Sequence, residues 1–157
     1  MTYYNIPFKY GMENFVTAMA ERGLQGAIIP DLPPEEGEEF MIAMERARLS
    51  TILIFSPTTP DARMKNLGSM GRGFIYCVAR KGVTGRETAF SEDLDTYLAR
   101  CRRATDLPLA VGFGVKGKED MDFLKGKADI AVIGTQTIRV MEERGIPAVG
   151  DFLKGLR

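Results

Sequence analysis

Short runs of apolar, β-prone residues alternate along this chain with segments of helical periodicity, and this alternation is the feature that most restricts the fold. The apolar runs are nearly continuous, which is typical of parallel strands that are buried on both faces. We expect strands at Gly26–Pro30, Thr51–Phe55, Gly73–Val78, Leu109–Gly112 and Ile130–Ile133. The pattern therefore predicts an α/β protein built on a parallel sheet.

Between the apolar runs, hydrophobic residues recur at the spacing of one helical face. Met12, Phe15, Val16 and Met19 form the clearest set, and Leu94–Cys101 forms a second. Weaker patterns predict helices at Glu35–Arg48, Asp61–Met70, Lys118–Leu124, Thr137–Arg144 and, after Pro147, Ala148–Leu156. Each predicted strand is thus followed by a helix.

No segment is typical of a linker or of low complexity, so we expect a single domain over residues 1–157. Asp31 and Ser91 have side-chain oxygens and are predicted to cap the helices that follow them. Met1–Asn5 is interpreted as the end of a sixth strand. Six such strands fit either a doubly wound open sheet or part of a barrel, and the residues at the strand ends distinguish the two.

The composition narrows the chemistry. The 21 basic side chains balance 21 acidic ones, so nothing attracts the chain to nucleic acid or to an anionic membrane. The sequence contains no histidine, which excludes Ser-His and Cys-His catalysis and removes the usual zinc ligand. Cys77 and Cys101 lack metal-ligand spacing and are expected to be reduced thiols in the core. No signal peptide or membrane span is recognisable, and we expect a cytoplasmic protein.

Glycines follow three of the predicted strands, at Gly82–Gly85, Gly112–Gly114 and Gly134 with Thr135. Glycine at such a place lets backbone N–H groups approach an anion, and the N-terminus of the next helix adds favourable partial charge. Barrels commonly hold phosphate with the loops after their last two strands. The glycines could be ordinary tight turns, but two consecutive strand ends of this type favour phosphate binding. The dinucleotide and P-loop glycine motifs are absent, and no cofactor or metal is expected.

The order and spacing of several motifs resemble those of the tryptophan synthase alpha chain family. The resemblance covers nearly the whole chain, and its most specific part is Pro30–Glu36, which other phosphate-binding barrels lack. The motifs that carry it are Tyr3–Asn5, Pro30–Glu36, Pro57–Pro60, Gly82–Gly85 and Val111–Gly114. The resemblance implies a (β/α)8 TIM barrel that is incomplete at the N-terminus, with about six of the eight strands.

The resemblance also implies a lyase that cleaves indole-3-glycerol phosphate to indole and glyceraldehyde 3-phosphate, with a tryptophan synthase beta subunit as partner. Residues carried over by motif to the phosphate are Gly85, Gly114, Gly134 and Thr135. Those carried over to the indole and glycerol pocket are Tyr76, Thr84, Phe113, Ile54 and Ile28. Thr135 stands where the family usually has serine, and its hydroxyl can still donate. For Tyr76, Ile54 and Ile28, packing of a barrel interior is an equal alternative.

One departure weakens the implied activity. The family's catalytic glutamate and aspartate lie in a segment that would precede Met1, and no corresponding motif occurs in this sequence. Asp31 is better explained as a cap or a subunit contact, so we name no catalytic residue and expect the chain alone to be inactive. A non-catalytic module that binds phosphate or docks to a beta subunit remains an alternative. A relative of indole-glycerol-phosphate synthase is the weakest hypothesis, because the expected lysine-bearing strands are missing.

Overall fold

The computed structural model describes residues 1–78, 92–112 and 114–156. Within them every strand pairing is parallel, as the alternating pattern predicts. The strands are β1 (Gly26–Ala27), β2 (Ser50–Thr51), β3 (Ile54–Phe55), β4 (Ile75–Val78), β5 (Leu109–Gly112) and β6 (Ile130–Ala131). All five predicted strand segments are therefore confirmed, although most are shorter than their apolar runs.

The strands are joined in the order β1-β2 and β3-β4-β5-β6, and one extended segment connects the two groups. Residues 50–55 contain both β2 and β3. The Ile52 N–H donates to the Ala27 carbonyl at 3.0 Å, and the Leu53 carbonyl accepts the Tyr76 N–H at 2.9 Å. This segment thus pairs with β1 through its first half and with β4 through its second.

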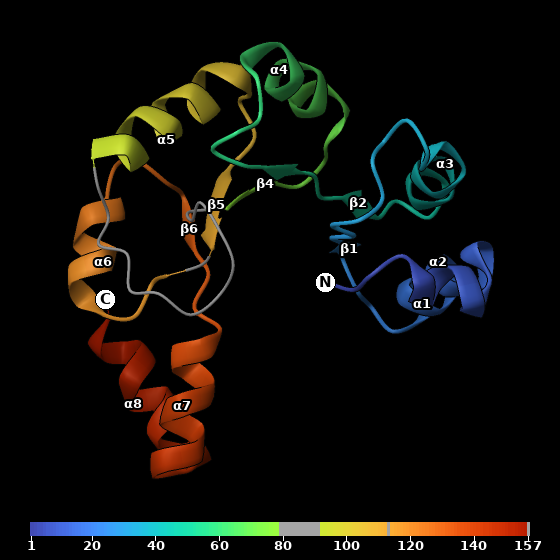
Figure 1. Ribbon diagram of the computed structural model, residues 1–157. Helices are drawn as coiled ribbons and strands as arrows, with labels where there is room; N and C mark the ends of the chain where they lie inside the picture. The colour runs from blue at the N-terminus through green and yellow to red at the C-terminus, as the bar shows by residue number, and fades with distance from the viewer. Residues whose placement is uncertain (79–91, 113, 157) are drawn as a thin grey trace.

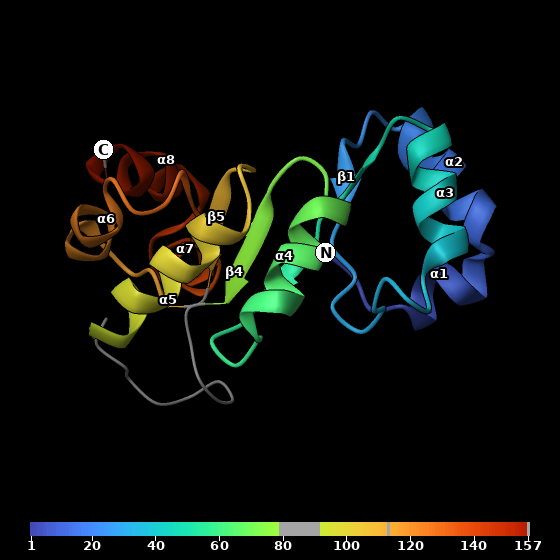
Figure 2. The same ribbon diagram turned by 90° about the horizontal axis from the view of Figure 1, so that it is seen from above.

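Helices follow the strands around the outside of the sheet (Figures 1 and 2). Figure 1 shows α4, α5 and α6 beside β4 to β6, and α1 to α3 beside β1 and β2. The helices are α1 (Asn5–Tyr10), α2 (Met12–Glu21), α3 (Glu38–Arg46), α4 (Asp61–Met70), α5 (Glu92–Ala104), α6 (Lys118–Leu124), α7 (Thr135–Arg144) and α8 (Ile146–Gly155). Each predicted helix is present, and α4 and α6 have the predicted bounds.

Two helices begin at residues other than those predicted, each for a local reason, and one helix was missed. Helix α3 begins only at Glu38, because the residues before it form turns in which the Gly37 N–H donates to the Pro34 carbonyl at 3.2 Å. Helix α8 begins at Ile146 rather than after Pro147, because proline is tolerated in the first turn, where its missing N–H has no helical partner. Helix α1 was not predicted and is only 6 residues long.

The expected sixth strand is present only as a single contact. The Thr2 N–H donates to the Ile28 carbonyl at 3.0 Å, alongside β1, and the chain then turns into α1. Asp31 does not cap the helix that follows it, since the N-cap of α3 is Gly37. Its carboxylate instead accepts the Tyr4 N–H at 2.9 Å, at the start of α1. Ser91, the other predicted cap, lies outside the described residues.

The sheet packs its outer face against the helices in two clusters. The larger contains Phe55, Cys77 and Val111 from the strands with Met64 and Leu98 from the helices, all at most 1% exposed. The smaller joins β1 to α2 and α3 through Ala27, Ile29, Val16, Met19, Phe40 and Met44. Both cysteines are buried and free, as expected. No helix of the described residues is long and apolar enough to span a membrane.

Candidate functional site

Two of the predicted pocket residues share the sheet face that points away from the helices. The register aligns Ile54 with Tyr76 and Tyr76 with Ala110, whereas their neighbours Phe55 and Cys77 belong to the helix-facing cluster. Successive side chains of a strand point to opposite faces, so Ile54 and Tyr76 lie on the inner face. These two side chains therefore lie together on the face of the sheet opposite the helix-facing cluster.

Ile28 follows the same rule at β1. Its neighbours Ala27 and Ile29 both pack in the cluster with α2 and α3, so Ile28 faces the other side of the sheet. It is 9% exposed, and its carbonyl accepts the Thr2 N–H. Ile28, Ile54 and Tyr76 are thus placed on one face, and whether they contact a ligand or only fill the interior stays a prediction.

The Tyr76 side chain crosses to the next strand. A Cβ atom built on Gly112 would lie 1.9 Å from its hydroxyl oxygen and 2.3 Å from its ring carbon Cζ. Glycine at position 112 is therefore required for the ring to occupy this place. Burial raises the pKa of Tyr76, so at neutral pH the phenol is protonated and can donate a hydrogen bond.

The predicted phosphate residues Gly114 and Gly134 stand at equivalent positions on neighbouring strands. Val111 of β5 pairs in register with Ala131 of β6. Gly114 comes three residues after Val111, and Gly134 comes three residues after Ala131, so both glycines lie beyond the carboxyl ends of their strands. Gly114 has a φ of 115°, a conformation that favours glycine. Gly134 is the N-cap of α7, and Thr135 is the first residue of that helix. The structure thus brings Gly114, Gly134 and Thr135 to the same edge of the sheet.

Among the described residues, a Cβ atom added at Gly134 would meet nothing within 4 Å, and Gly134 precedes the first amides of α7. The first amides of a helix have no helical partner and carry partial positive charge. Such an end can accept an anion. The remaining predicted site residues, Thr84, Gly85 and Phe113, lie outside the described residues.

A pocket of about 250 Å³ opens beside Ile54, between the loop after β1 and helix α4. Its lining includes Asp31, Ile52, Ile54 and Arg63. A larger pocket of about 600 Å³ lies between α3 and the end of α4 and includes Ser50 and Arg72 at the beginning of strand segments. It contains none of the predicted site residues, and we therefore centre the candidate site on the strand carboxyl ends rather than on this larger space.

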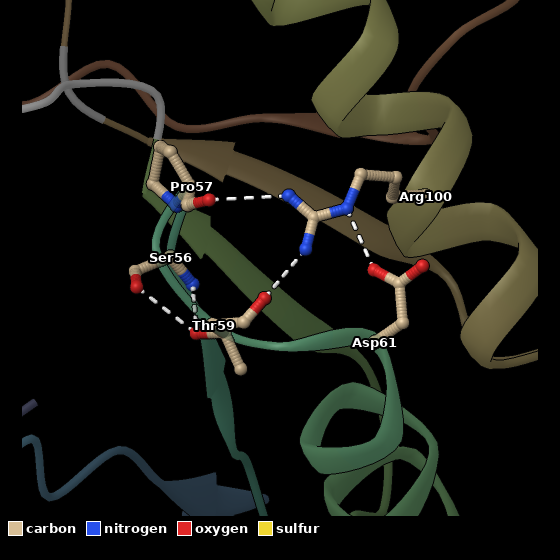
Figure 3. A network of polar contacts seen from close by, with 5 residues as sticks. All are labelled: Ser56, Pro57, Thr59, Asp61 and Arg100. Carbon is tan, nitrogen blue, oxygen red and sulfur yellow. Dashed lines mark hydrogen bonds and ion pairs between the residues drawn. The ribbon is translucent and has the colours of Figure 1, made fainter.

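A polar network around Arg100, at the carboxyl end of β3, was not predicted from the sequence (Figure 3). The Arg100 guanidinium of α5 donates to the Pro57 carbonyl at 3.1 Å and to the Thr59 carbonyl at 2.6 Å, and it pairs with Asp61 at 2.7 Å. These partners are 39 to 43 residues away in sequence, so no local spacing could have revealed them. The network ties the loop after β3 to helix α5.

Two other carboxylates, those of Asp120 and Asp129, accept backbone N–H groups. Asp120 accepts the N–H groups of Lys116 and Gly117 at the start of α6, at 2.6 and 3.2 Å. Asp129 accepts the Leu109 N–H at 2.8 Å and pairs with Arg102, and these contacts lower its pKa. Both carboxylates therefore have a structural explanation.

In the described part of the chain, no group of three or more Cys, Asp and Glu residues is placed to hold a metal ion. Both thiols are buried. The hydrogen bond between them and burial raise the pKa of Cys77, whereas the same hydrogen bond lowers the pKa of Cys101.

Comparison with known proteins identifies the family. A model of the family "Tryptophan synthase alpha chain" matches residues 1–149. The tryptophan synthase alpha chain of Desulforapulum autotrophicum is 61% identical over 156 residues, which are 99% of this chain and 62% of the relative. That of Syntrophotalea carbinolica is 56% identical over 157 residues, 100% of this chain and again 62% of the relative. This chain therefore spans about 62% of the length of these curated relatives.

Solved structures agree with the sequence relatives. A tryptophan synthase structure from Mycobacterium tuberculosis matches with a TM-score of 0.89 and 30% identity, over 99% of this chain and 59% of that chain. A Pyrococcus furiosus structure, described as a study of mutual activation of the tryptophan synthase α2β2 complex, matches with a TM-score of 0.86 and 31% identity, over 99% and 63%. The parallel strands and outer helices are thus part of a (β/α)8 barrel, and the chain belongs to the tryptophan synthase alpha chain family.

Proposed function

We propose that this chain carries the phosphate-binding and substrate-lining part of a lyase of tryptophan biosynthesis. The substrate is indole-3-glycerol phosphate, and the products are indole and glyceraldehyde 3-phosphate. Membership of the family supports this assignment. The observation that carries it is the equivalent placement of Gly114 and Gly134 at the carboxyl ends of two neighbouring parallel strands, in front of α7.

The two ends of the substrate are held differently. Gly85, Gly114, Gly134 and Thr135 hold the phosphate, through backbone N–H groups and the Thr135 hydroxyl. The indole and glycerol parts lie against Ile28, Ile54, Tyr76, Thr84 and Phe113. The inner-face positions of Ile28, Ile54 and Tyr76 support this division, because they present apolar surface and one phenol to the centre of the sheet.

The partner is a tryptophan synthase beta subunit, and the protein acts in the cytoplasm. The partner is supported by the Pyrococcus furiosus relative, whose structure is described as part of an α2β2 complex. Two free, buried cysteines fit a reducing compartment.

Calorimetric titration of the purified chain with inorganic phosphate tests the site. Gly134→Asp is expected to abolish binding, because it places a like charge at the N-terminus of α7, where a new Cβ atom would meet none of the described residues within 4 Å. Gly150→Asp, in α8, adds the same charge at another glycine whose Cβ atom would meet none of those residues within 4 Å, and it should leave binding unchanged. An unaltered phosphate affinity in Gly134→Asp would show that the site has been misplaced.

A further inference from the structure

All three nitrogens of the Arg100 guanidinium contact the segment from Pro57 to Asp61. Its Nε atom pairs with Asp61 at 2.7 Å, Nη1 donates to the Pro57 carbonyl, and Nη2 donates to the Thr59 carbonyl (Figure 3). The side chain is only 25% exposed, so solvent weakens these contacts less than at an open surface. A planar fork with three occupied nitrogens fixes both the distance and the orientation of the loop relative to α5.

The loop that Arg100 holds is itself closed by its own side chains. The Thr59 hydroxyl accepts the Ser56 N–H at 3.0 Å and lies 2.9 Å from the Ser56 hydroxyl, which is 3.0 Å from that of Thr58. These contacts turn the loop back on itself. Arg100 therefore positions residues 56–60 as one unit.

That unit connects two parts of the pocket beside Ile54. The loop begins where β3 ends, one residue after Phe55, and it leads directly into α4 at Asp61. Arg63, in the first turn of α4, lines this pocket and also pairs with Glu35. The loop thus leads from Ile54, which β3 holds in register with Tyr76, to Arg63 on the other side of the pocket of about 250 Å³, and its position sets where Arg63 stands.

We propose that Arg100 is a positioning residue for the indole end of the substrate. By fixing residues 56–60 and the start of α4, it sets the shape of the pocket beside Ile54. The inference rests on the proposed function. It concerns only the indole end of the substrate. The loop that Arg100 holds follows β3, whereas Gly134 follows β6, and strands β4 and β5 lie between them.

The test compares two probes by calorimetry, indole-3-glycerol phosphate and inorganic phosphate, on the same chain. Arg100→Ala should weaken binding of indole-3-glycerol phosphate by roughly tenfold, because binding must then order a loop that the arginine no longer holds, while phosphate affinity stays nearly unchanged. Arg100→Lys should weaken it similarly, because one ammonium cannot reproduce the three directed contacts. Arg103→Ala, at an exposed position of the same helix, is the control and should bind both probes normally.

The outcomes separate positioning from general support of the fold. A cooperative urea-unfolding transition shows that a variant is folded, and Arg100→Lys serves if Arg100→Ala does not fold. Wild-type affinity for indole-3-glycerol phosphate in Arg100→Ala, equal loss of both probes in every folded Arg100 variant, or rescue by lysine would each overturn the inference. Failure of the unmodified chain to bind indole-3-glycerol phosphate would instead refute the proposed function, and the role of Arg100 with it.

Discussion

The hydroxyl oxygen of Tyr76 on β4 lies beside Gly112 on β5, within 1.9 Å of where a Cβ atom at position 112 would stand. Gly112 is paired in register with Val78, two residues beyond Tyr76 on the neighbouring strand. The ring therefore leans across the strand gap towards the carboxyl ends, where the proposed site lies. The fit of the Tyr76 ring beside Gly112 therefore affects both the packing of the inner face and the shape of the proposed site.

Gly112→Ala is expected to destabilise the chain by about 1–3 kcal/mol, because the added methyl group must displace the ring of a buried tyrosine. Urea unfolding measures this cost. Gly150→Ala is the control, since a Cβ there meets none of the residues that the structure describes within 4 Å, and it should be neutral or slightly stabilising inside α8. The cost of Gly112→Ala should shrink in a Tyr76→Leu background, where the two positions no longer compete for space. An equal cost in both backgrounds would show that the clash is not with Tyr76.

Much of the fold could be predicted because its signals are local. Continuous apolar runs marked the five strand segments, and the i, i+3, i+4 spacing of residues such as Phe15 and Met19 marked the helices. Parallel pairing followed from their alternation. The short helix α1 was missed, because its apolar residues Ile6, Phe8 and Tyr10 are exposed and form no core-facing stripe. Its start is instead held by Asp31, which is distant in sequence.

Asp31→Ala is expected to lower stability by about 1 kcal/mol, the usual effect of removing a side chain that holds the first amides of a helix. The local effect should be faster hydrogen exchange of the Tyr4 amide, which donates to the Asp31 carboxylate at 2.9 Å. Asp31→Asn keeps an oxygen acceptor and is expected to preserve most of the protection. Unchanged Tyr4 exchange in Asp31→Ala would contradict this role.

The ion pair between Glu35 and Arg63 predicts a specific pH dependence. Its hydrogen bonds with Arg63 lower the pKa of Glu35 from 4.5 to about 2. A carboxylate with a depressed pKa in the folded state stabilises the protein above its unfolded pKa, and the contribution is lost as pH falls towards the folded value. The stability difference between the unmodified chain and Glu35→Gln should therefore be constant near neutral pH and decline between about pH 4.5 and pH 2.

Urea unfolding at a series of pH values measures this difference, and added salt should reduce it, because the pair is partly exposed to solvent. Arg63→Gln is the matched variant and should remove the same pH-dependent part. A difference that stays flat across the whole range would mean that the pair does not form in solution.

The candidate site was only partly predictable. Gly114 and Gly134 were found because glycine after a buried strand is a local signal, and the parallel register then brings them to one edge. The Arg100 network was not found, since an arginine on a helix surface has no distinguishing neighbours in sequence. The space for the Tyr76 ring at Gly112 was also hidden, because it arises from packing between strands that lie more than 30 residues apart in sequence.

The last prediction is that the purified 157-residue chain binds indole-3-glycerol phosphate without releasing indole at an appreciable rate. Cleavage requires an acid at the indole ring and a base at its nitrogen, and removing such groups typically costs factors of about 10² to 10⁴ each. The sequence has no histidine, Asp31 is engaged with the Tyr4 amide, and Asp120 and Asp129 accept backbone N–H groups.

Co-expression with the strand-helix units that carry the family's glutamate and aspartate should restore indole release, which can be followed by its fluorescence. The same units with both carboxylates replaced by amides are the control: they should associate with the chain but leave it inactive, because only the proton-transfer groups are missing. Robust indole release by the chain alone, lost in Asp31→Asn, would contradict the prediction. It would also assign Asp31, and not a residue supplied by those units, as the acid-base group.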